Sequence, residues 1–150
     1  MSFLNPRHIF PLFVATTTTF GGLLALFNPT GSIKAFGLPD RIASSPTAHA
    51  TFSLSSARTS VIGLLIYTFH ARGDFRAIDS VLLISGFYCG IVDGYVCYKE
   101  GESGKGLFRV LSSWAVGLYG GLGITSVSHV ALVSSMFEIV ANHEILHTQG

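Results

Sequence analysis

Four apolar stretches, each about as long as a membrane-spanning helix, constrain this chain more than any other feature. A helix needs about 20 mostly apolar residues to cross the hydrocarbon core of a bilayer. The stretches cover residues 8–27, 48–71, 76–98 and 107–128. We therefore predict an all-α integral membrane protein, a four-helix bundle that forms a single membrane domain over residues 1–150.

The charge content points to the same class of protein. Charged residues make up 11% of the chain, whereas soluble domains carry about 25%, and the mean hydropathy is +0.54. The net charge of +1 supplies no basic field that would attract phosphates. We therefore expect a lipid bilayer as a partner and no nucleic acid. The endoplasmic reticulum is the expected membrane.

The end of the chain, residues 129–150, is predicted to form a short C-terminal amphipathic extension. Its apolar residues recur at roughly helical spacing, at Val130, Val133, Phe137 and Val140. A helix with one apolar face either prolongs the fourth span or lies along the membrane surface.

This extension also contains a short metal-binding string. His143-Glu144-Ile145-Leu146-His147 matches the HExxH pattern of zinc proteases. The string lies near the last residue, and no third ligand follows it. Cys89 and Cys97 are eight residues apart, which matches no metal-binding spacing. We expect no metal site and no cofactor.

Ionisable residues inside the apolar stretches are informative, because a charge there is costly unless it is paired or functional. Arg58 is in the second stretch and Asp93 is in the third. A tight turn at residues 72–75 makes these stretches antiparallel, so both residues fall in the same half of the membrane. We predict that they face each other in one pocket. Either the pair is a structural clamp, or Arg58 orients an oxygen atom of a ligand while Asp93 acts as an acid or base.

Other polar side chains share that half of the membrane. Tyr88 and Glu100 are predicted to assist the acid–base chemistry, and His49, Tyr95 and Trp114 are predicted to contact the substrate. Each has a plainer alternative, because tyrosine and tryptophan near helix ends often anchor a protein at the membrane interface. Glu100 has the alternative of a solvated loop residue.

The order of several short motifs resembles a family of small fungal and bacterial membrane proteins, filed as domain of unknown function 4267. The resemblance covers about residues 20–125. Its motifs in this chain are Asn28-Pro29, Phe36-Gly37-Leu38-Pro39, Ala57-Arg58, Gly63, Arg76-Ala77, Gly86, Asp93-Gly94 and Gly101. The resemblance implies a four-helix membrane bundle and singles out Arg58 and Asp93. It implies no particular activity.

The fungal members look similar to small membrane proteins that tailor secondary metabolites. We therefore expect a membrane-embedded enzyme of the cyclase or isomerase type, which acts on a lipophilic small molecule by acid–base chemistry. Two alternatives are a non-catalytic binding or accessory protein and an anthrone-type oxygenase that needs no cofactor. A transporter is a further alternative, and it would require a homo-oligomer because four helices without an internal repeat make a poor pore.

The HExxH string gives a first testable prediction. Deleting residues 143–150 should leave folding and activity intact, because the string has no third metal ligand after it. Size-exclusion chromatography, thermal unfolding and zinc analysis of the truncated protein check this expectation. Loss of bound zinc together with loss of activity would contradict it.

Overall fold

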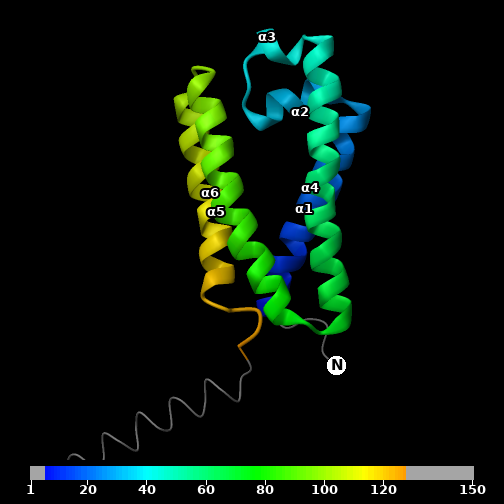
Figure 1. The fold of residues 1–150 in the computed structure, drawn as a ribbon, viewed down its shortest axis with the longest axis vertical. Coiled ribbons are helices and arrows are strands. Elements are labelled where there is room, and N and C mark those ends of the chain that lie inside the picture. Colours follow the sequence, from blue (N-terminus) through cyan, green and yellow to red (C-terminus); the bar gives the residue numbers. More distant parts are fainter. Residues whose placement is uncertain (1–5, 128–150) are drawn as a thin grey trace, which may run out of the picture.

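The computed structural model describes residues 6–127, and within this range the chain forms six α-helices and no strand. The four long helices form two antiparallel pairs (Figure 1). The helices of the first pair are α1 (Pro6–Phe27) and α4 (Pro46–Arg72), and those of the second are α5 (Phe75–Lys99) and α6 (Ser103–Gly121). The predicted all-helical class is therefore confirmed.

The chain between the first two long helices forms a roof over one end of the molecule. It contains two short helices, α2 (Pro29–Phe36) and α3 (Asp40–Ala43) (Figure 1). The Asn28 side chain accepts a hydrogen bond from the Gly31 backbone nitrogen at 2.9 Å and so caps α2. Gly37 ends α2 with φ of 112°, a left-handed conformation that favours glycine.

Two of these helices, α1 and α5, are long and apolar enough to cross a membrane. Only 28% of the most apolar window of each helix is buried. Neither therefore resembles the enclosed core helix of a globular domain. The predicted extension at residues 129–150 lies outside the described residues, as does the HExxH string. Helix α6 ends at Gly121, short of the predicted end at residue 128.

Glycines bring α5 and α6 into backbone contact. Gly86, Gly90 and Gly94 are buried along one stripe of α5. A Cβ atom on Gly86 would lie 2.4 Å from the backbone nitrogen of Gly117, closer than real Cβ contacts allow. The stripe of small residues therefore lets the two backbones approach at a distance that no larger side chain permits.

The pair of α1 and α4 is packed in a similar way. A Cβ atom on Gly63 would meet the side-chain oxygen of Thr19 at 2.2 Å, and one on Gly22 would meet that of Ser60 at 2.2 Å. The Ser60 hydroxyl donates to the Thr19 carbonyl at 3.1 Å, which links the two helices. Each pair is thus a closely packed unit.

The two pairs are joined at the end opposite the roof. The turn at Gly73 and Asp74 connects α4 to α5 (Figure 1). The Tyr119 hydroxyl of α6 donates to the Arg7 carbonyl of α1 at 2.7 Å. The buried carboxylate of Asp79 accepts hydrogen bonds from two backbone nitrogens of the segment after α6, Thr125 at 3.1 Å and Ser126 at 2.9 Å. These contacts close this end, which we call the base.

The close approach of α5 and α6 predicts that a larger residue in place of Gly86 destabilises the protein. Gly86→Ala should lower the free energy of unfolding by about 1–3 kcal/mol, because the added methyl group would meet backbone atoms. Gly104→Ala is the matched control, since nothing lies within 4 Å of its Cβ position. Thermal unfolding of the purified protein in detergent should show a lower midpoint for Gly86→Ala only. Equal midpoints for the two variants would contradict the contact.

Candidate active site

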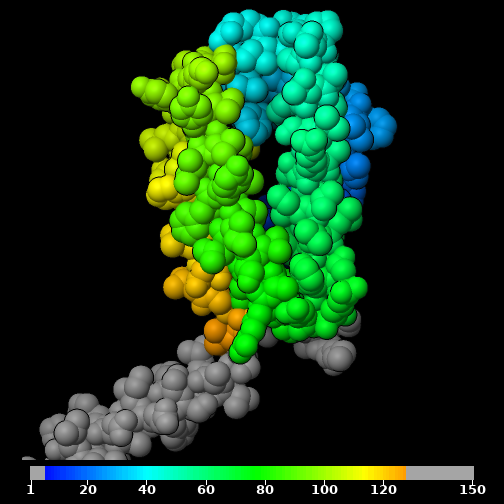
Figure 2. Space-filling view, viewed as in Figure 1, coloured from blue at the N-terminus to red at the C-terminus, as the bar shows by residue number. Residues whose placement is uncertain are grey.

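A cavity of about 740 Å³ lies between the two helix pairs, under the roof. Side chains from α1 to α5 line it, with Arg109 as the contribution of α6. The space-filling view shows a gap between α4 and α5 on this face (Figure 2). Most of the larger lining side chains are apolar: Leu24, Ile33, Phe36, Leu38, Ile42, Phe52, Val92 and Val96. The volume is in the range of small-molecule sites.

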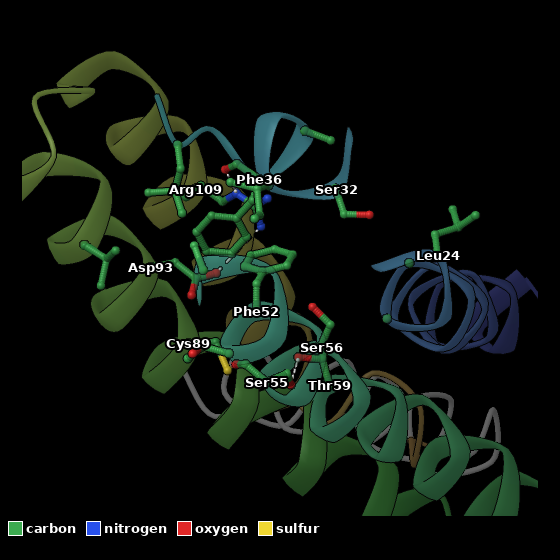
Figure 3. A pocket seen from close by; sticks show the side chains of 18 of the residues that line it. Leu24, Ser32, Phe36, Phe52, Ser55, Ser56, Thr59, Cys89, Asp93 and Arg109 are labelled. Atoms are coloured by element: carbon green, nitrogen blue, oxygen red, sulfur yellow. Dashed lines mark hydrogen bonds and ion pairs between the residues drawn. The ribbon is translucent and has the colours of Figure 1, made fainter. Parts of the chain in front are cut away.

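Asp93 and Arg109 place two charges in this apolar lining (Figure 3). An Asp93 carboxylate oxygen lies 3.7 Å from a terminal nitrogen of the Arg109 guanidinium. Both side chains are only partly exposed, at 24% and 30%. Charges held in such surroundings interact more strongly than they would in water.

Arg109 also holds the roof in place. Its Nε donates to the Phe36 carbonyl at 3.0 Å, and its guanidinium carbon lies 4.0 Å from the centre of the Phe36 ring. The Phe36 ring in turn meets the edge of Phe52 at 5.6 Å between centroids. One side chain of α6 is thus connected to α5 through the carboxylate and to α2 through the backbone and the ring.

Further ion pairs fasten the roof on its outer side. Arg41 of α3 pairs with Glu100 at the end of α5. Lys34 and Asp40 form an ion pair at 2.8 Å between α2 and α3. The hydrogen bond from Lys34, together with its charge, lowers the pKa of the Asp40 carboxyl group.

The serine hydroxyls of the cavity differ from most hydroxyls of the long helices in their hydrogen bonding. Thr51 and Thr59 line the cavity and donate to the carbonyl one turn earlier. Ser32, Ser55 and Ser56 also line it, but their hydroxyls make no hydrogen bond among residues 6–127. These three hydroxyls are therefore available to a molecule in the cavity.

The predicted pairing of Arg58 with Asp93 is wrong. Arg58 is exposed and does not line the cavity, whereas the charge partner of Asp93 is Arg109. The physical reason is the geometry of the helices, since α4 and α5 meet at the base and diverge toward the roof (Figure 1). At the level of Asp93, α6 is the close neighbour of α5.

The structure places the other predicted site residues away from the cavity lining. Tyr88 and Tyr95 are exposed, at 69% and 63%, and Trp114 packs against Phe87 with ring centroids 5.7 Å apart. Glu100 pairs with Arg41, as described above. Of the seven predicted site residues, Asp93 alone lines the cavity.

His49 lies under the roof and makes structural contacts. Its Nε2 donates to the Ala43 carbonyl at 2.7 Å and lies 3.2 Å from the Thr30 hydroxyl. Because a carbonyl can only accept, this nitrogen carries a proton. His49 therefore links α4 to α2 and α3.

Arg109 was missed as a site residue, although the sequence contains a signal for it. Asp93 precedes Gly101 by eight residues, and Arg109 follows Gly101 by eight residues. Two helices joined by a short turn place such positions at the same level. Among residues 6–127, no group of three histidine, cysteine or acidic side chains could hold a metal ion.

The contacts of Arg109 predict its effect on stability. Arg109→Gln should lower the free energy of unfolding by about 1–3 kcal/mol, because it removes the charge opposite Asp93 and the cation over the Phe36 ring. Arg58→Gln should change it by less than about 0.5 kcal/mol, as expected for an exposed residue. Denaturant titration in detergent measures both. A larger loss of unfolding free energy in Arg58→Gln than in Arg109→Gln would contradict the assignment of Arg109 as the partner of Asp93.

Comparisons with known proteins identify a family. A family model described as "Domain of unknown function (DUF4267)" matches residues 15–123, which include all the residues of the cavity. No curated protein and no solved structure matches the chain.

Proposed function

Because this chain belongs to the family described as domain of unknown function (DUF4267), we propose its function from the site: a membrane-embedded enzyme that acts on a lipophilic small molecule by acid–base chemistry. The observation that carries the proposal is a carboxylate and a guanidinium in a cavity of about 740 Å³ with mostly apolar walls. Ionisable side chains in such surroundings are costly, and they mark functional sites in membrane proteins.

Membrane embedding extends to all four long helices in this proposal. The outer surface of α6 carries exposed apolar side chains that water would not favour: Leu107, Phe108, Leu111 and Leu118. On α4, Leu54, Val61, Leu64 and Leu65 are exposed in the same way. Exposed apolar side chains on every long helix are suited to contact with lipid, and they support a four-span bundle.

Asp93 takes the role of acid or base, and Arg109 takes the role that the sequence suggested for Arg58. A carboxylate within hydrogen-bonding reach of a bound molecule can remove or return a proton. The guanidinium next to it can bind an oxygen atom on which negative charge develops. Many cyclisations and isomerisations proceed by such proton transfers, so the site suits this class of reaction.

One observation favours the alternative of a non-catalytic binding protein. Arg109 bonds to the Phe36 carbonyl and stacks on its ring, and these contacts are explained by the roof alone. In that case, Asp93 serves only to neutralise Arg109. The experiment must therefore separate binding from conversion.

Asp93→Asn separates the two functions. The amide is nearly isosteric with the carboxylate, so the variant should fold and bind, but it should convert its substrate at least about 100-fold more slowly. Expressed in the native host, it should accumulate bound substrate, which mass spectrometry of the extracted protein would detect. Wild-type protein should then convert this molecule to a product of the same mass.

Controls and other outcomes complete this test. Arg58→Gln should convert the trapped molecule at the wild-type rate, because Arg58 does not line the cavity. Full activity of folded Asp93→Asn would favour the binding protein. A product that has gained an oxygen atom would indicate an oxygenase of the anthrone type.

A further inference from the structure

The carboxylate of Asp93 has unused hydrogen-bonding capacity. Among residues 6–127, its oxygens accept no hydrogen bond, and the guanidinium nitrogen at 3.7 Å is too far away for one. An ionised carboxylate has about four acceptor positions. A molecule in the cavity that presents a hydroxyl group would supply the missing donor.

Arg109 has unused hydrogen-bond donors, which complement the unused acceptor positions of Asp93. A guanidinium has five N–H donors, and a single described hydrogen bond uses one of them, from Nε to the Phe36 carbonyl. Of the other nitrogens, Nη1 lies 3.7 Å from the carboxylate (Figure 3). The pair therefore offers an acceptor and a donor within a few ångströms of each other.

A second polar position lies elsewhere in the cavity. Ser55 and Ser56, on α4, carry hydroxyls without a described partner, whereas Thr51 and Thr59 satisfy theirs within the helix. Figure 3 shows these serines away from the group of Asp93, Arg109 and Phe36. Figure 3 shows Phe52 between the two positions, and most of the larger side chains that line the cavity are apolar.

We propose that the ligand of this cavity is a lipophilic molecule with a hydroxyl group next to a carbonyl group at one end and another oxygen function at the other. This inference rests on the proposed function and names its substrate class. The hydroxyl donates to Asp93, the neighbouring carbonyl accepts from Arg109, and the distant oxygen meets Ser55 and Ser56. The apolar body occupies the space between them.

A fluorescent probe and a matched competitor, whose affinity is measured by displacement of the probe, test the first end of the ligand. Flavonol is a lipophilic fluorophore with a hydroxyl group next to its carbonyl, and flavone is the same ring system without that hydroxyl. The full-length protein in phosphatidylcholine nanodiscs should bind flavonol at least about tenfold more tightly than flavone, as expected for a hydrogen bond to a charged group. Asp93→Asn should remove this preference and leave the affinity for flavone unchanged.

The serines test the second end. The probe is a flavonol with a further hydroxyl on its pendant ring. The double variant Ser55→Ala/Ser56→Ala should bind it about two- to tenfold more weakly, and plain flavonol unchanged. The matched control is Ser80→Ala/Ser85→Ala, whose hydroxyls donate to the carbonyls of Arg76 and Val81 within α5.

The outcomes separate the ligand class from the cavity itself. Thr59→Trp should abolish binding of every probe, because the indole would fill the cavity that Thr59 lines. Equal affinities for flavonol and flavone, both lost in Thr59→Trp, would overturn the ligand class but keep a lipophilic site. Failure of all probes to bind above empty nanodiscs would overturn the ligand class and the cavity site together.

Discussion

The contact between the backbones of α5 and α6 is the constraint on which the site depends. Because Gly86, Gly90 and Gly94 have no side chains, the two helices run close together from the base to the roof. This separation brings Arg109 near Asp93, and Arg109 in turn holds Phe36 of the roof. A wider separation would leave the carboxylate without a counter-charge. The positions of the two charged side chains in the cavity thus depend on glycines that do not line it.

Much of the fold follows from the sequence, because it depends on local patterns. The four apolar stretches match the four long helices, and the short turn at residues 72–75 makes α4 and α5 antiparallel, as predicted. The two roof helices were not predicted. Their signals are the cap at Asn28, the proline after it and the left-handed Gly37, which are short and lie in a segment with several prolines.

The site was harder to predict, because it depends on the separation of helices in space. Asp93 could be recognised as a charge in an apolar stretch, and it does line the cavity. Its partner could not be identified from register along the membrane alone, since Arg58 and Arg109 both lie near its level. The choice depends on the glycine contact with α6 and on the divergence of α4 from α5 (Figure 1). The seven residues were predicted to lie in the same half of the membrane. Whether a residue lines the cavity also depends on the side of the helix from which its side chain projects.

The unequal joining of the two helix pairs has a mechanical consequence. At the base, a covalent turn and the hydrogen bond from Tyr119 to Arg7 hold the pairs together, whereas charged side chains cross between the two halves at the roof. A rotation of one pair about the base would therefore displace the helices more at the level of Asp93 than at the base itself. The Arg41–Glu100 pair resists this rotation from a partly exposed position, where dissolved ions weaken it. Salt in the water next to the roof would thus weaken one of the contacts that hold the two halves together at this end.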